Sequence, residues 1–193
     1  MALLTGTRKI KTAVFISGTG SNLNSLIKFS NLKKSPISID LIVSDNPKAK
    51  GLRYSKIFNI KKKVFNYKNK DIAEKKIFAE IKKDKIKLIC LAGFMKIISK
   101  DFINKFNGKI LNIHPSLLPK YKGLNTHQRA IMNNEKISGC TVHFVNSKLD
   151  SGKIILQKSV KITKKDTPST LARKILAKEH NLYPEAILKI FSF

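Results

Sequence analysis

The sequence predicts an α/β protein with a doubly wound, mostly parallel sheet, flanking helices and a late antiparallel hairpin. Short apolar runs typical of strands buried on both faces alternate with segments that suit helices. Turn residues such as those at 18–20 and 45–47 separate these segments. Near the end, two strand-like runs at 139–145 and 154–162 follow each other with too few residues between them for a crossover, so we expect them to pair antiparallel.

The earlier elements follow in strict alternation. Within 71–83, the apolar residues Ala73, Ile77 and Ile81 recur every four positions among charged residues, which predicts an amphipathic helix. Strands are predicted at 12–17, 38–44, 64–66, 87–92 and 109–113, and further helices at 21–29, up to Tyr54, and at 100–106. After the hairpin we expect a helix at 168–176, with Thr167 as its cap and Pro168 in its first turn, and a second stretch from Pro184.

Length and composition predict one domain, 11–193, after a short N-terminal extension, 1–10. No apolar run approaches the roughly 20 residues that a membrane helix needs, and the first residues lack a signal-peptide core, so we expect a cytoplasmic protein. Cys90 and Cys140 lie far apart in apolar runs, with neither a disulfide framework nor a metal-ligand spacing. We expect both to be reduced core thiols, and no metal.

The formal net charge of +27 has two explanations. A nucleic-acid-binding protein gathers its basic residues on one face or mixes them with stacking aromatic residues. Here the lysines are spread along the chain, and the densest tract, 61–63, is short. This pattern favours a solvated surface over a nucleic-acid footprint, although either would concentrate anionic ligands.

The segment SGTGSN, residues 17–22, joins a predicted buried strand to a predicted helix. Its two glycines allow close approach of an anion, and the free N–H groups of the helix would point at it. Leu23 stands where a dinucleotide fingerprint requires a third glycine, and no Gly-Lys-Ser/Thr follows. A phosphate cradle and a tight turn without a ligand both remain open.

A second candidate site comes from Asn112 and His114, which strand alternation places on the same side at a strand end. An amide and an imidazole there can stabilise a developing oxyanion, and Pro115 and Pro119 stiffen the loop that follows. A histidine with a purely structural role is the alternative. Asp150 is either a turn residue or the carboxylate that orients His114, and sequence spacing does not decide between these.

Several segments, in order, resemble the folate-dependent phosphoribosylglycinamide formyltransferase family. They are SGTGSNL, LAGFMKIIS, LNIHPSLLPKYKGLNTHQRA, GCTVHFV, LDSGKIILQ and KEHNLYP, and the resemblance extends from about Lys11 to the C-terminus. It implies an enzyme that transfers the formyl group of 10-formyltetrahydrofolate to the amine of glycinamide ribonucleotide in purine biosynthesis, without a metal. A monomer and a homodimer are both compatible with it.

The resemblance also implies roles for individual residues. Catalysis falls to Asn112, His114 and Asp150, with Thr141 and His143 as supports. Residues matching the substrate site are Gly20, Ser21, Asn22 and Glu179. Residues matching the folate site are Lys70, Met95, Lys96, Ile97, Ile98, Asn112, Asn146, Leu149 and Asp150.

Some features depart from the family or point to rivals. Lys96 stands where relatives often carry Arg, which replaces a forked donor with a point charge, and Lys70 is a similar case. The chain ends at Phe193, earlier than many relatives. Methionyl-tRNA formyltransferase and formyltetrahydrofolate deformylase share the catalytic segment, but we expect each to carry a further domain. A basic nucleic-acid-binding protein is the non-enzymatic alternative, and it predicts salt-sensitive binding.

Overall fold

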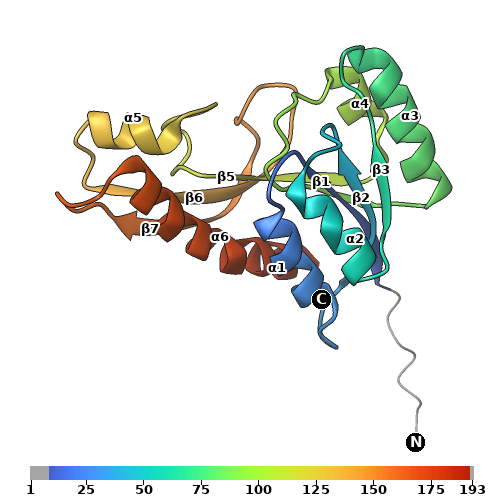
Figure 1. Ribbon diagram of the computed structural model, residues 1–193, viewed down its shortest axis with the longest axis horizontal. Coiled ribbons are helices and arrows are strands. Elements are labelled where there is room, and N and C mark those ends of the chain that lie inside the picture. The colour runs from blue at the N-terminus through green and yellow to red at the C-terminus, as the bar shows by residue number, and fades with distance from the viewer. Residues whose placement is uncertain (1–8, 192–193) are drawn as a thin grey trace, which may run out of the picture.

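The computed structural model describes residues 9–191, which form seven strands in one sheet and helices on both of its faces (Figure 1). The strand order is β3-β2-β1-β4-β5-β6-β7. Strands β1 to β5 run parallel, whereas β6 is antiparallel to β5 and β7 to β6. The strands are β1 Ile10–Ile16, β2 Ile37–Ser44, β3 Lys61–Val64, β4 Leu88–Leu91, β5 Lys109–His114, β6 Ile137–Phe144 and β7 Ile154–Lys161. The predicted fold class is confirmed.

Two apolar cores lie on opposite faces of the sheet. Successive residues of β1 alternate between them: Val14 packs in the core under α1 and α6, and Phe15 in the core under α3 and α4 (Figure 1). This explains why β1 is an unbroken apolar run. The helices are α1 Ser21–Ser30, the 3₁₀ turn η1 Lys50–Leu52, α2 Arg53–Ile57, α3 Lys70–Lys83, α4 Lys100–Lys105, α5 Thr126–Met132 and α6 Pro168–Phe191.

The strand order changes direction between β1 and β4. From β1 the chain builds outward to β2 and β3, then returns to add β4 and β5 on the other side. In open α/β sheets, ligands bind at such a switch point, outside the carboxyl ends of the strands. The loops after β1, β4 and β5 therefore mark the place to look for a site.

The last helix differs from the prediction of two stretches, because α6 runs unbroken through Pro184. A proline has no N–H, so the carbonyl of His180, four residues earlier, loses its partner in the helix. The hydroxyl of Ser25 on α1 donates to that carbonyl at 2.6 Å. A contact from a distant part of the sequence thus satisfies the carbonyl that Pro184 frees.

Two further predictions about elements were wrong. The third strand is not 64–66 but Lys61–Val64, so the lysine tract itself forms a sheet edge, where charged residues discourage further strand pairing. Lys61 is held there by ion pairs of 2.7 Å with Glu80 and with Asp84. Helix α5 was not predicted, although its buried residues Thr126 and Ala130 are four positions apart.

The ends of the chain and the cysteines complete the comparison. Ile10, which falls in the predicted extension, already belongs to β1, and residues 1–8 and 192–193 lie outside the described range. Cys90 and Cys140 are free and buried, as predicted. Among residues 9–191, no helix has the length and apolar character to cross a membrane.

Candidate active site

Asn112, His114 and Asp150 meet at the carboxyl end of β5. Nδ1 of His114 lies 3.4 Å from Oδ2 of Asp150, and the Asn112 amide nitrogen lies 3.4 Å from Oδ1 of the same carboxylate. Asp150 comes from the β6–β7 connection, where its φ of 44° turns the chain back toward β5. The side chains of His114 and Asp150 are each 7% exposed, and Asn112, taken as a whole residue, is half-buried. The cluster is therefore largely shielded from solvent.

Strand β6 adds His143 to this cluster. It pairs directly with Asn112 in the sheet, and its Nε2 lies 3.2 Å from the Asn112 amide nitrogen and 3.7 Å from Asp150 Oδ1. Its Nδ1 lies 2.8 Å from the Phe144 carbonyl, so Nδ1 is the donor and Nε2 accepts from the amide. His143 thus touches two of the three predicted catalytic residues.

The loop between β5 and α5 closes the other side of the cluster. The Tyr121 carbonyl accepts from His114 Nε2 at 2.8 Å, and the Gly123 N–H donates to Asp150 Oδ2 at 2.8 Å. Arg129 on α5 secures this loop, since its guanidinium lies over the Tyr121 ring and donates to the Lys122 carbonyl at 2.7 Å. Both His114 nitrogens therefore face oxygen acceptors.

Thr141, on β6, anchors the proline-containing stretch that precedes Tyr121. Its hydroxyl donates to the Ser116 carbonyl at 2.6 Å and accepts from the Leu118 N–H at 3.1 Å. Gln157 of β7 donates to the same Thr141 oxygen at 2.9 Å. The antiparallel strands thus hold the loop on which the surroundings of His114 depend.

Burial and charge oppose each other in this cluster. Burial lowers the pKa of His114 below its usual value, although the Tyr121 carbonyl and the Asp150 charge both act to raise it. Burial acts to raise the pKa of Asp150, but the hydrogen bond from the Gly123 N–H and the nearby His143 and His114 rings together lower that pKa. Asp150 is therefore an anion near neutral pH, next to an imidazole that gives up its proton readily.

The N-terminus of α1 forms a second part of the site. Gly20 precedes the helix with a φ of 73°, and a Cβ there would lie 2.6 Å from the Gly51 Cα. Close packing against the η1 turn therefore leaves no space for a side chain at position 20, so this position requires glycine. Ser21 begins the helix, and the buried Asn22 amide donates to Glu179 of α6 at 2.7 Å.

Beside the N-terminus of α1, Glu179 has a raised pKa and, among the described residues, Asn22 has an unpaired buried oxygen. Burial raises the pKa of Glu179, and the hydrogen bond from Asn22 only partly opposes this. Within residues 9–191, the Asn22 Oδ1 atom is buried and has no hydrogen-bond partner. Buried polar atoms are nearly always paired, so the arrangement suits a ligand that donates to Asn22.

The predicted folate-site residues divide by exposure. Met95 and Ile97 are 65% and 64% exposed on the loop after β4, while Ile98 is buried in the core below it. Leu149 and Asn146 are exposed on the loop that ends at Asp150. Lys96 lies 3.7 Å from Asp45, and Lys70 is the first residue of α3. In the described part of the chain, no hydrogen bond or ion pair joins Lys70 to the cluster.

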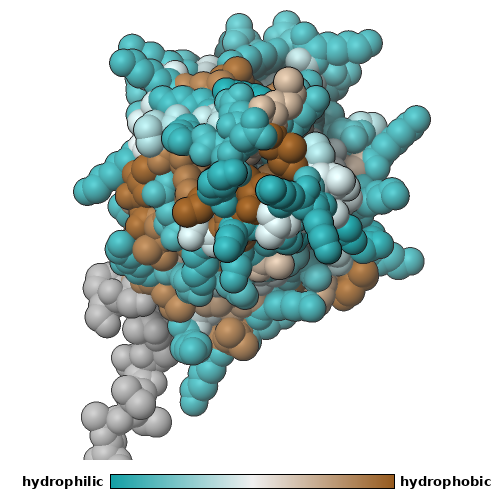
Figure 2. All heavy atoms as spheres, turned by 90° about the vertical axis from the view of Figure 1, so that its left-hand side faces the viewer, coloured by the Kyte–Doolittle hydropathy of each residue, from teal (hydrophilic) through white to brown (hydrophobic). Residues whose placement is uncertain are grey.

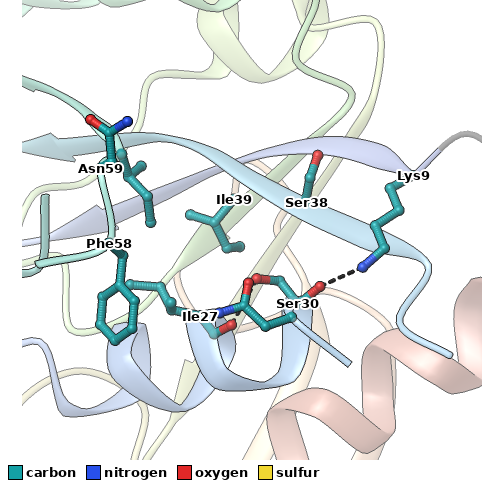
Figure 3. A pocket seen from close by; sticks show the side chains of 9 residues that line it. Lys9, Ile27, Ser30, Ser38, Ile39, Phe58 and Asn59 are labelled. Carbon is teal, nitrogen blue, oxygen red and sulfur yellow. Dashed lines mark hydrogen bonds between the residues drawn. The ribbon is translucent and has the colours of Figure 1, made fainter. Parts of the chain in front are cut away.

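One cleft elsewhere on the described surface contains none of these groups. A cleft of about 390 Å³ lies beside β2 and the end of α1, and Lys9 there donates to the Ser30 carbonyl at 2.6 Å (Figure 3). It is lined by no residue of the cluster. Hydrophilic side chains are spread over the face in Figure 2, with apolar patches between them. Among residues 9–191, no group of three or more His, Cys, Asp and Glu is arranged to hold a metal ion.

Four groups that shape this site were not predicted from the sequence: the Tyr121 carbonyl, the Gly123 N–H, Arg129 and Asp45. The first two are backbone atoms, for which residue type carries no signal. Asp45 had a usable one, because it follows β2 directly and therefore lies at the carboxyl edge of the sheet.

Several known proteins are similar to this chain over most of its length. The formyl transferase family model matches residues 10–187. The chain is 41% identical over 188 residues to the human trifunctional purine biosynthetic protein adenosine-3, covering 96% of this chain but 19% of that protein. It is 41% identical to phosphoribosylglycinamide formyltransferase of Haemophilus influenzae, over 92% of this chain and 85% of that one.

Solved structures with the same fold were also found. The phosphoribosylglycinamide formyltransferase of Brucella melitensis matches with a TM-score of 0.89 and 41% identity, covering 95% of this chain and 96% of that one. The enzyme of Bacillus halodurans matches with a TM-score of 0.90 and 35% identity, over 94% and 95% of the two chains.

Proposed function

The chain belongs to the formyl transferase family, and on that premise we propose that it transfers the formyl group of 10-formyltetrahydrofolate to the amine of glycinamide ribonucleotide. The observation that carries the proposal is the cluster of Asn112, His114 and Asp150 at the carboxyl end of β5. The names of relatives matched over most of their length support the choice of acceptor and a role in purine biosynthesis.

The transfer needs an oxyanion stabiliser and a path for one proton. The substrate amine attacks the formyl carbon, a tetrahedral oxyanion forms, and the bond from that carbon to N10 of the folate breaks. The amine loses one proton and N10 gains one, so the reaction has no net proton change. A residue that accepts and returns a proton, together with a donor for the oxyanion, is therefore sufficient.

His114 suits the proton-transfer role because its environment balances two effects. Oxygen acceptors lie near both ring nitrogens, Asp150 at Nδ1 and Tyr121 at Nε2, which favours the imidazolium. Burial lowers its pKa and so favours release of the proton. His114 can therefore accept the proton of the amine and release it again readily, and Asp150 sets the orientation of the ring.

Asn112 is our proposed oxyanion donor. Its amide nitrogen lies between His143 Nε2 and Asp150 Oδ1, and the residue as a whole is half-buried. Once His114 has accepted the proton of the amine, its charged imidazole adds a second stabilising group. No covalent enzyme intermediate is required.

The ribonucleotide is proposed to bind at the N-terminus of α1. The free N–H groups at the start of this helix and its dipole favour a phosphate there, with Gly20, Ser21 and Asn22 as the nearest residues. Glu179 and the unpartnered Asn22 Oδ1 offer acceptors for hydroxyl or amine groups of the substrate.

The folate is proposed to bind across the loops after β4 and β6. The exposed Met95, Ile97 and Leu149 offer apolar surface for a pterin, and Asn146 lies on the same loop as Leu149. Lys96 and Lys70 are proposed to meet the acidic tail, and Ile98 supports the loop from the core. We further propose a cytoplasmic enzyme, monomeric or homodimeric, without a metal, and for which nucleic acid is not a ligand.

A single assay tests the proposal: release of tetrahydrofolate from 10-formyltetrahydrofolate, followed by absorbance, with and without glycinamide ribonucleotide. We expect release that depends on the ribonucleotide and falls about 10²–10⁴-fold in His114→Ala. His180→Ala, which removes a histidine that is not among the cluster residues, is the matched control and should retain activity. Release that ignores the ribonucleotide would instead indicate a hydrolase, and no release would refute the proposal.

A further inference from the structure

Asp45, directly after β2, lies at the centre of a polar network that no catalytic role accounts for. Its side chain is 8% exposed. Its Oδ1 accepts from the Ser17 hydroxyl at 2.5 Å, and its Oδ2 lies 3.7 Å from Nζ of Lys96. Burying a carboxylate costs free energy unless hydrogen-bond and ion-pair partners compensate for the lost water. The partners of Asp45 supply that compensation.

The direction of the hydrogen bonds in this network is fixed by chemistry. The Met95 N–H donates to Ser17 Oγ at 2.8 Å, so the Ser17 hydroxyl must direct its own proton elsewhere, and Asp45 is the acceptor. The chain of bonds therefore runs from the Met95 backbone, through Ser17, to a negative charge. A charged acceptor strengthens such a bond.

The start of the loop after β4 is held by backbone hydrogen bonds and by aromatic packing. The Ser17 N–H donates to the Gly93 carbonyl at 3.1 Å, and Asn46 donates to the Ser17 carbonyl at 3.1 Å. Phe94 packs edge-on against Phe15 and against Tyr67, with ring centroids 5.4 and 5.5 Å apart. Between Met95 and Ile97, however, the bond to Ser17 and the Lys96 ion pair are the polar links of this loop to the sheet edge within residues 9–191.

We propose that Asp45 is a positioning residue for the folate-binding loop 93–98: through Ser17 it fixes the Met95 backbone, and through its second oxygen it holds Lys96. In this role the carboxylate need not touch substrate or the reacting atoms. It sets how Met95 and Ile97 present their apolar side chains and keeps Lys96, a flexible point charge, at the edge of the sheet. This inference rests on the proposed function for its ligand but not for its geometry.

Two substitutions separate the parts of the network. Asp45→Ala removes the acceptor for Ser17 and the charge beside Lys96, and we expect the KM for 10-formyltetrahydrofolate to rise about tenfold. We expect kcat and the KM for the ribonucleotide to stay within about twofold, because the cluster around His114 is untouched. Asp45→Asn retains an acceptor for Ser17, so the rise should be about threefold. Asp40→Ala, which removes another carboxylate of β2 that bonds Ser38 and Thr12, is the matched control.

A second measurement does not depend on activity. Amide hydrogen exchange at Met95, followed by NMR, should accelerate about tenfold or more in Asp45→Ala and remain unchanged in Asp40→Ala. If wild-type protein transfers no formyl group, the proposed function fails while this readout still tests the positioning role. If the wild-type enzyme is active and Asp45→Ala changes neither the folate KM nor Met95 exchange, the positioning role is overturned. A fall in kcat equal to the rise in KM would overturn it as well, since it would place Asp45 in catalysis.

Discussion

The two halves of the sheet build their share of the site in different ways. On the β1 side, the groups offered to a ligand are backbone N–H groups at the start of α1 and a loop after β4, held by glycine packing and by Ser17. On the β5–β7 side, buried side chains face each other across an antiparallel ladder, with Asp150 contacting Asn112, His114 and His143. We therefore propose that the first half binds ligands through shape and that the second carries the reaction through its network of charged groups.

This difference predicts which kinetic parameter a substitution changes. A substitution on the antiparallel side should lower kcat, because the groups there act on charge that develops during the reaction. A substitution on the parallel side should raise KM or lower stability, because the groups there stabilise the bound substrate and the transition state equally. The predictions below test this division.

The largest effect is expected for Asp150→Asn. The substitution retains size but removes the charge that orients His114, so kcat should fall about 10²–10³-fold while the KM values change little. Steady-state kinetics measures this. Asp101→Asn, which neutralises a carboxylate that is 72% exposed on α4, is the control. A variant with normal kcat and a high KM would remove the proposed distinction between the halves.

Gly51→Ala should lower stability through a change on the parallel side. A Cβ at Gly51 would lie 2.7 Å from Ile16 Cδ1 and 2.8 Å from Gly20 Cα. The overpacking should lower the free energy of unfolding by about 1–3 kcal/mol. Gly18→Ala is the matched control, since a Cβ there meets no atom within 4 Å among the described residues. Chemical denaturation compares the two, and equal losses would contradict the packing argument.

Glu179→Gln should affect binding of the ribonucleotide alone. The side chain of the variant still accepts a hydrogen bond from Asn22 but carries no charge. A charge on the acceptor contributes about 1 kcal/mol to such a hydrogen bond, so we expect KM to rise about fivefold at unchanged kcat. Glu185→Gln removes a carboxylate of the same helix that pairs with Lys158 on the surface, and it should leave KM unchanged. An unchanged KM in Glu179→Gln would separate this residue from the substrate site.

The smallest effect concerns the protonation of His114. Burial already lowers its pKa, and Asp150 acts against this, so Asp150→Asn should lower the pKa further. NMR titration can follow it because the chain has four histidines, and His180 should titrate unchanged as an internal control. Removing an anion that raises the pKa cannot by itself increase it, so a higher His114 pKa in the variant would contradict the assigned contact.

The same shift has a consequence for stability. Since the folded-state pKa of His114 lies below the unfolded value of about 6.5, the unfolded chain takes up its proton first as the pH falls. The contribution of His114 to stability is therefore complete above that unfolded value. It declines as the pH falls from there toward the folded-state pKa.

Much of the fold follows from local patterns. The apolar runs that became β1, β2 and β4 and the four-residue spacing of α3 depend on neighbouring residues alone, and these elements lie where the pattern predicts them, within a few residues. The doubly wound sheet then follows from their alternation. The strand at 61–64 was misplaced because its lysines, which hold ion pairs with α3, carry no apolar signal.

The candidate site divides in the same way. Asn112 and His114 share a strand, so alternation along that strand already places them on one side. Their meeting with Asp150 depends on a left-handed turn 36 residues beyond His114 in the sequence and on the Gly123 N–H, neither of which leaves a mark in local spacing. The continuity of α6 through Pro184 likewise depends on Ser25, from the other end of the chain.

The amino-acid sequence alone therefore determines most of the alternation of strands and helices and the residue types available for chemistry, because these depend on interactions a few residues apart. The folded chain decides which of those residues meet, how their pKa values shift and which backbone atoms join them. Those properties arise from burial and from contacts between distant segments, and they turn Asp150 from a turn residue into the centre of the site.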